Sequence, residues 1–165
     1  MKTKIATIGG IAALAIAGTA VSVPAQAQYR DKISHDASKC SADGGPAVWV
    51  SISGVKESKG TIRVQSYRGT KADWLEKGRW INRIELPAKA GTMRVCMPLP
   101  APGAYGIAAR HDLDGDGATD LFGDGGAMSN NPSVSIFNLG KPNYKKVIFN
   151  VGSGVESISI QMRYR

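Results

Sequence analysis

The chain has 165 residues and a formal net charge of +8, a length that one domain of ordinary size can use to bury a hydrophobic core. Its lysines and arginines are scattered, and the longest basic run is Lys145–Lys146. The sequence therefore offers no dense basic patch for nucleic acid, and the positive charge is read as a solubilising surface. It contains no internal repeats.

The first 27 residues have the pattern of a secretory signal peptide. Lys2 and Lys4 precede an uncharged, largely apolar run over residues 5–23, and Ala25 and Ala27 stand at the spacing of a small-x-small cleavage site. The alternative is a membrane anchor, but three glycines interrupt the run, and a span needs about 20 consecutive apolar residues. We predict cleavage after Ala27 and export to the periplasm or the extracellular space. The mature chain then has no transmembrane segment, and its net charge falls from +8 to +6 because two lysines leave.

A polar N-terminal arm, residues 28–45, follows the predicted signal peptide. It contains Cys40, and the second cysteine of the chain is Cys96. An even pair of cysteines in an exported protein predicts a disulfide, whereas the alternative is two independent free thiols. A bridge between Cys40 and Cys96 would attach the arm to the sheet.

Residues 46–165 are predicted to form a single all-β domain. Apolar and polar side chains alternate in several short segments, and turns rich in Gly, Pro and Ser separate nearly all of them. Only residues 71–78 could form a short helix, since helix-forming residues there are followed by Gly78. Six or seven short strands of this kind predict an antiparallel β-sandwich with at most one short helix. The predicted strands lie within residues 47–53, 61–67, 92–99, 104–110, 145–151 and 156–164.

Negative charge is concentrated in one stretch of this basic chain. No Lys or Arg stands between Arg110 and Lys141, whereas five aspartates do. The stretch carries −5, so the rest of the mature chain carries +11, which is +6 less −5. Repulsion among these carboxylates needs compensation, and a bound cation is one candidate.

The spacing of the aspartates is that of a calcium-binding loop. Counted from Asp112, they occupy positions 1, 3, 5 and 9, and a glycine at position 6 permits the sharp turn. Position 12 holds Gly123 in place of a bidentate Glu, and no flanking helices are predicted, so we expect a weak calcium-type loop between strands. The alternative is a loop of Asx-turns without an ion. The predicted calcium ligands are Asp112, Asp114, Asp116, the carbonyl of Ala118, and Asp120.

Two motifs flank the loop. Gly103-x-Tyr105 begins a strand that ends in His111-Asp112, and Ser129-Asn130-Asn131 follows the loop. With these motifs the chain resembles the bacterial domain-of-unknown-function family 2141, a set of small exported proteins, from about Cys40 to Tyr164. The resemblance implies a transthyretin-like or Cna-B-like sandwich, which is a relative of the immunoglobulin-like fold, and it implies export, but it carries no activity.

The sequence contains no recognisable catalytic constellation. Its two histidines are His35 in the polar arm and His111, and there is no G-x-S-x-G nucleophile motif. Zinc hydrolysis needs several His or Cys ligands, and both cysteines are expected in the bridge. We interpret His111 as a structural residue whose ring hydrogen-bonds across a strand end. The protein is therefore predicted not to be an enzyme.

Two non-catalytic functions fit these features. One is a calcium-stabilised binding module of the cell envelope that displays loops at one end of the sandwich. The other is a metal-free structural accessory that partners an envelope protein through a strand edge or through exposed tryptophans. The same tryptophans could stack on a glycan and make a weak carbohydrate-binding module, unless they pack in the core. They are Trp49, Trp74 and Trp80.

Overall fold

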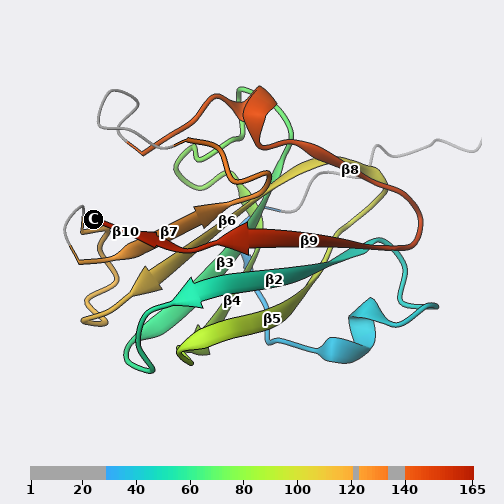
Figure 1. The fold of residues 1–165 in the computed structure, drawn as a ribbon. Coiled ribbons are helices and arrows are strands. Elements are labelled where there is room, and N and C mark those ends of the chain that lie inside the picture. The colour runs from blue at the N-terminus through green and yellow to red at the C-terminus, as the bar shows by residue number, and fades with distance from the viewer. Residues whose placement is uncertain (1–28, 121–122, 134–139) are drawn as a thin grey trace, which may run out of the picture.

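The computed structural model describes residues 29–120, 123–133 and 140–165. The signal peptide predicted over residues 1–27 lies outside these residues. The described chain forms two β-sheets packed on each other, with two short 3₁₀ helices, η1 (Ala37–Cys40) and η3 (Tyr144–Lys146), and no α-helix (Figure 1). None of its helices has the length and apolar character that crossing a membrane requires. The predicted all-β sandwich is confirmed.

The larger sheet has seven strands. Its order runs from β1 at one edge to β10 at the other, and β8 pairs with the first residues of β6 beside β7. All neighbours are antiparallel except β1 and β4, which are parallel. In sheet order the strands are β1 (Asp31–Lys32), β4 (Trp80–Pro87), β3 (Thr61–Arg68), β6 (Gly103–Asp112), β7 (Gly125–Met128) and β10 (Arg163–Tyr164), with β8 (Phe149–Val151).

The smaller sheet has three strands, in the order β5 (Gly91–Pro98), β2 (Ala47–Val55) and β9 (Val155–Gln161). Strand β2 is antiparallel to β5 and parallel to β9. The fold thus differs from the prediction in two details. The described residues form ten strands rather than six or seven, and two of the pairings are parallel.

The core lies between the two sheets. Val48, Val50 and Ile52 of β2 are fully buried, and they belong to one cluster with Ile62 and Val64 of β3. The alternation read from these segments therefore places their apolar faces correctly. Figure 1 shows β9, β2 and β5 crossing in front of the larger sheet, so that the inner faces of both sheets enclose this cluster.

The polar arm is attached to both sheets. Strand β1 pairs with β4 at the edge of the larger sheet, and the predicted disulfide between Cys40 and Cys96 of β5 is present. The two Cα atoms are 5.8 Å apart, and the indole of Trp49 donates a hydrogen bond to the Cys40 carbonyl at 3.2 Å. The disulfide prediction is confirmed.

The short helix considered for residues 71–78 is wrong. The chain makes short hydrogen-bonded turns instead: the Trp74 N–H donates to the Thr70 carbonyl, and Leu75 then adopts a left-handed φ of 53°. The Asp73 carboxylate accepts hydrogen bonds from Thr70 Oγ1 and from Tyr29 of the arm. Burial raises the pKa of Asp73, but these two hydrogen bonds and the Arg79 charge outweigh it and lower that pKa. Tertiary contacts therefore override the local helix propensity.

Two of the three tryptophans considered as an exposed interaction surface are buried. Trp74 and Trp80 pack in a second apolar cluster with Tyr67 and Val147, and the Trp74 indole donates to a backbone carbonyl. Trp49 is partly buried, and the Arg94 guanidinium lies 4.0 Å from its ring centre. The packing alternative holds for Trp74 and Trp80, because each has a large apolar surface that the sheet can cover.

Candidate functional site

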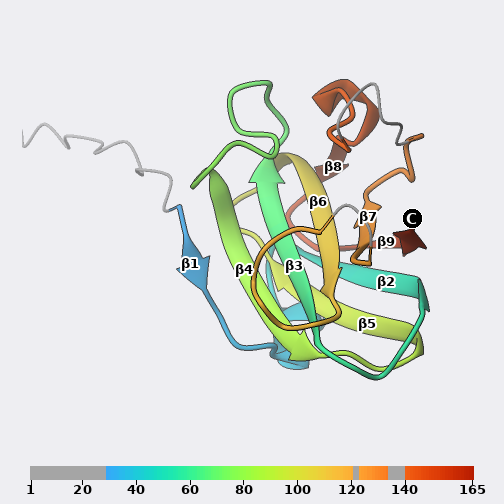
Figure 2. The ribbon, with the colours of Figure 1, turned by 90° about the vertical axis from the view of Figure 1, so that its left-hand side faces the viewer.

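The Asp-rich loop leaves the end of strand β6. His111 and Asp112 are the last two residues of that strand, and the chain returns to the sheet at Gly125, the first residue of β7. Figure 2 shows this connection in front of the seven-stranded sheet. The loop therefore begins and ends on neighbouring strands, which hold its first acid in a defined position.

Three of the predicted calcium ligands converge. Asp112, Asp114 and Asp116 each offer one carboxylate oxygen, and these oxygens lie within 4.8 Å of one another. Asp112 is buried, whereas the other two are exposed. Asp120 is not part of this group of three, and Ala118 contacts the group through its N–H, which donates to the Asp116 carboxylate.

The backbone of the loop is folded around the same carboxylates. Asp112 accepts hydrogen bonds from the N–H groups of Gly115 and Gly117, at 2.9 and 3.0 Å. Asp114 accepts from the N–H of Asp116, two residues later. Both glycines have a φ of 79°, which a residue with a side chain rarely adopts. The bonds from the N–H groups of Asp116 and Ala118 to the carboxylates two residues earlier are the Asx-turns of the metal-free alternative.

An arginine supplies part of the counter-charge. Arg110 Nη2 lies 3.1 Å from Asp112 Oδ2 and also donates to the Gly117 carbonyl, while Nη1 donates to Thr119 Oγ1. The sequence reasoning missed this contact, because Arg110 stands just outside the stretch without basic residues. The contact could have been predicted from the spacing: Arg110 stands two residues before Asp112 on one strand, so both side chains lie on the same face.

The remaining acids have different roles. Asp124 accepts the N–H groups of Leu113 and Asp120, so it closes the loop rather than replacing the missing ligand at position 12. The negative charge of Asp116, followed by burial and the charges of the other loop acids, raises the pKa of Asp120. A cation near these groups would lower that pKa again.

His111 lies beneath the loop and is fully buried. Its Nε2 is 2.7 Å from the Lys59 carbonyl, and its Nδ1 is 2.6 Å from the Tyr164 hydroxyl. A carbonyl only accepts, so Nε2 carries the proton, and Nδ1 accepts from the Tyr164 hydroxyl. That hydroxyl in turn accepts the N–H of Lys56. The ring thus joins β6 to the turn after β2 and to β10, the structural role expected for it.

The Ser-Asn-Asn motif ties the two sheets together. Ser129 Oγ accepts the N–H of Ile107 and donates to the Val147 carbonyl. Asn131 accepts the Gln161 N–H and donates to the carbonyl of another β9 residue, so its side chain pairs with that strand as a neighbouring strand would. The neighbouring Asn130 donates to the Ile148 carbonyl, and both asparagines have left-handed φ angles.

The first motif makes a corner at the start of β6. Tyr105 is buried, and its hydroxyl donates to the Ala101 carbonyl at 2.7 Å, four residues earlier. A tyrosine that bonds back to the chain in this way fixes the entry of a strand into a sandwich. Gly103 is the first residue of β6, two positions before this tyrosine.

The comparisons with known proteins identify the family. The family model for an uncharacterised protein conserved in bacteria (DUF2141) matches residues 50–159. This chain belongs to DUF2141. No curated protein and no solved structure matches it. The DUF2141 match contains both motifs, His111 and the whole Asp-rich loop, whereas Cys40 and Tyr164 lie outside its bounds.

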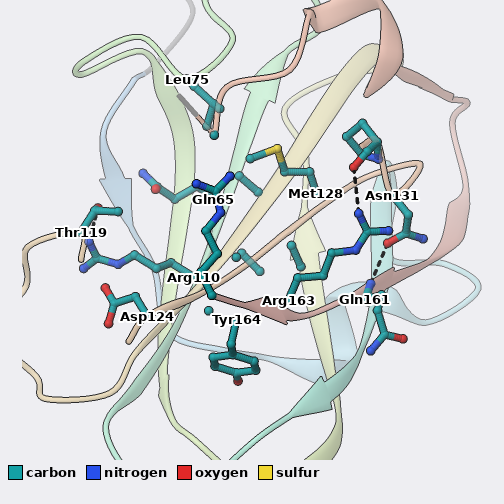
Figure 3. A pocket seen from close by; sticks show the side chains of 18 of the residues that line it. Gln65, Leu75, Arg110, Thr119, Asp124, Met128, Asn131, Gln161, Arg163 and Tyr164 are labelled. Atoms are coloured by element: carbon teal, nitrogen blue, oxygen red, sulfur yellow. Dashed lines mark hydrogen bonds between the residues drawn. The ribbon is translucent and has the colours of Figure 1, made fainter. Parts of the chain in front are cut away.

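A cavity lies beside the loop on the outer face of the seven-stranded sheet of this DUF2141 member. Its volume is about 500 Å³. Figure 3 shows Arg110 extending toward Thr119 on one side, with Asp124 nearby, and Arg163 next to Asn131 on the other. No local pattern in the sequence predicts this cavity, because its lining comes from strands far apart in the chain. Further lining residues are Gln65, Tyr67, Leu75, Ala108, Gly126 and Met128.

Proposed function

We propose that this protein is an exported, non-catalytic binding module of the bacterial cell envelope whose Asp-rich loop takes up calcium. The observation that carries the proposal is the convergence of carboxylate oxygens from Asp112, Asp114 and Asp116 within 4.8 Å at the end of β6. Calcium takes several oxygen ligands in a flexible arrangement, and carboxylates with backbone carbonyls are its common donors in proteins.

The residues present fit a calcium ion, although Arg110 competes with it for Asp112. Asp114 and Asp116 are exposed and use their oxygens only for local backbone hydrogen bonds. Asp112 is already paired with Arg110, so a calcium ion must share or displace that contact. The carbonyl of Ala118 and the Asp120 carboxylate would complete the ligand set. Competition with Arg110 and the missing Glu favour a Kd of about 10⁻⁴–10⁻³ M, typical of extracellular modules.

Calcium is expected to raise the melting temperature of the protein. With that Kd, calcium at about 5 mM stabilises the folded state by about 1–2 kcal/mol. The corresponding increase in Tm is about 3–8 °C for a chain of this size. Thermal unfolding followed by circular dichroism, with calcium and then with chelator in excess, measures the shift and its reversal.

Loop variants and a second metal make this experiment specific. Asp114→Ala and Asp116→Ala should each abolish the calcium shift and leave the sheet intact, since both side chains are exposed. Asp43→Ala removes an exposed acid of the arm and should leave the shift unchanged. Magnesium should do less than calcium, because a flexible loop suits its strict octahedral geometry poorly. A wild-type Tm indifferent to several millimolar calcium would remove the ion from the proposal.

Export is supported by the signal-peptide pattern of the first 27 residues and by the disulfide, which persists in an oxidising compartment. Mass spectrometry of the protein from an envelope fraction is therefore expected to give a mature N-terminus at Gln28. A chain that retains Met1 in that fraction would contradict cleavage. The non-catalytic role is supported by the engagement of both His111 ring nitrogens and of both cysteines in structural contacts.

A metal-free structural accessory is the second candidate. The observation in its favour is the Arg110 guanidinium, which neutralises Asp112 and bridges the loop without an ion. The calcium experiment separates the two candidates, and a pull-down from the native envelope fraction would identify a protein partner. A carbohydrate-binding role loses its main support, because Trp74 and Trp80 are buried.

A further inference from the structure

Arginines are aligned on the outer face of the seven-stranded sheet. Ile62 and Val64 face the core, so Arg63 between them points outward. The strand register places Arg63 opposite Arg110, Arg110 opposite Gly126, and Gly126 opposite Arg163. Residues paired in this way project from the same face of a sheet. Three arginines therefore share one row across four strands.

Positive charge exceeds the counter-charge along this row and the next. Arg63 pairs with Glu85 at 2.7 Å, and Glu85 is also the nearest acid to Arg83, at 3.8 Å. Burial, and after it the positive charge of Arg63, lowers the pKa of Arg83. Arg110 pairs with Asp112 at 3.1 Å, but its Nε is buried without a hydrogen-bond partner, and no acid lies within 4 Å of the charged nitrogens of Arg163 among the described residues. Arginines packed directly opposite each other repel, and an anion on this face would relieve that repulsion.

Gly126 leaves a slot between two of these arginines. Neighbouring strands lie about 4.8 Å apart, so the Cα atoms of Arg110 and Arg163 stand roughly 10 Å apart with a bare backbone between them. The next row continues the floor of the cavity with Ala108, whose side chain is also small, and with Met128. Tyr67 and Leu75 add apolar surface to the lining.

We propose that this cavity binds a small carboxylate ligand with an apolar body. The carboxylate lies over Gly126 and accepts hydrogen bonds from the guanidinium of Arg163, and the apolar body lies against Leu75 and Met128. A guanidinium has five N–H donors in a planar fork that matches a carboxylate, and the hydrogen bond of Arg163 to the Pro132 carbonyl uses one of them. A volume of about 500 Å³ is within the range of small-molecule sites.

The acids in the lining do not favour a cationic ligand instead. Asp124 already accepts two backbone N–H groups, and Asp120 belongs electrostatically to the Asp-rich loop, where Asp116 is its strongest neighbour. This inference rests on the binding role proposed above, because it names a ligand for that module. It does not require the calcium ion.

Titration with 4-phenylbutyrate and with octanoate, followed by two-dimensional NMR in the presence of EDTA, tests the proposal. For ligands of this size the expected Kd is on the order of 1 mM. Saturable shifts are expected at the amide of Gly126 and at the Nε groups of Arg110 and Arg163. The matched compounds 4-phenylbutanol and 4-phenylbutylamine have the same apolar body without the carboxylate, and they should leave these signals unchanged.

Three variants complete the experiment. Gly126→Val fills the slot and should abolish binding, and it should still fold, because no heavy atom lies within 4 Å of a Cβ placed there. Arg163→Gln removes one guanidinium from an exposed position and should weaken binding at least about tenfold. Lys39→Gln removes a charge from η1, which packs on the three-stranded sheet, and should bind as wild type does.

The proposal is overturned by a wild-type protein that shows no saturable shifts, by an equal response to the amine, or by a folded Gly126→Val variant that binds normally. Because chelator is present throughout, such a failure would remove the carboxylate ligand and leave the calcium result untouched. If calcium does not raise the Tm but the carboxylate still binds, the calcium proposal fails and the carboxylate proposal stands.

Discussion

Removal of the Cys40–Cys96 disulfide is expected to lower the free energy of unfolding by about 4 kcal/mol. The two cysteines are 56 residues apart, and a cross-link across a loop of this length restricts the unfolded chain by about that amount in the chain-entropy model. The bridge also holds η1 against β5. Such a loss is a large fraction of the 5–15 kcal/mol that stabilises a typical domain.

Urea unfolding of the Cys40→Ala, Cys96→Ala double variant measures this loss. Alanine is the suitable replacement because Cys96 is fully buried and a serine would bury a hydroxyl there. Reductant should lower the unfolding midpoint of the wild type and leave that of the double variant unchanged. Equal midpoints for the oxidised and reduced wild type would show that the bridge contributes nothing to stability.

The sequence predicted the strands in which one face is buried over several residues. Alternation was clear in β2 and β3, because one sheet face is packed and the other is polar. Strand β4 was missed, since a register shift opposite residues 65–67 places Ile81 and Ile84 three positions apart and breaks the alternation. Strand β1 has two residues, too few for any periodic signal, and the single strand predicted over residues 156–164 is divided into β9 and β10, which belong to different sheets.

The candidate site was predictable only where it is local in the chain. The spacing of Asp112, Asp114 and Asp116 implied that their oxygens converge, because alternate residues of a tight loop face the same centre. The contact of Arg110 with Asp112 is also local, since the two residues are two positions apart on β6, but the alignment of Arg110 with Arg163 depends on strand register. Register joins segments more than 50 residues apart, and no local pattern in the sequence encodes it.

The motifs that carry the family resemblance surround the loop with structural ties. Tyr105 fixes the start of β6, Asn131 pairs with β9, and His111 connects the end of β6 to β10. Each of these side chains satisfies backbone or hydroxyl groups from a second segment of the chain. The family motifs therefore hold β6 and its loop in place. Among their residues, the buried His111 should have the largest effect on stability when it is replaced.

The variant His111→Phe is expected to lower the free energy of unfolding by about 3 kcal/mol. Phenylalanine fills a similar volume, but it neither donates to the Lys59 carbonyl nor accepts from the Tyr164 hydroxyl, which are bonded to His111 at 2.7 and 2.6 Å. A buried polar group that loses its partner costs about 1–3 kcal/mol. His111→Gln keeps one donor and one acceptor, so about half of the loss should be recovered.

A double-mutant cycle with Tyr164→Phe separates the hydrogen bond from the packing of the two rings, whose centres are 5.8 Å apart. The single variant Tyr164→Phe should cost about 1 kcal/mol, because its hydroxyl also accepts the Lys56 N–H. In His111→Phe the Tyr164 hydroxyl has already lost the ring nitrogen that accepts its proton. The double variant should therefore be about 1 kcal/mol more stable than the sum of the two single losses predicts. Strictly additive losses in urea unfolding would show that the His111–Tyr164 hydrogen bond does not couple β6 to β10.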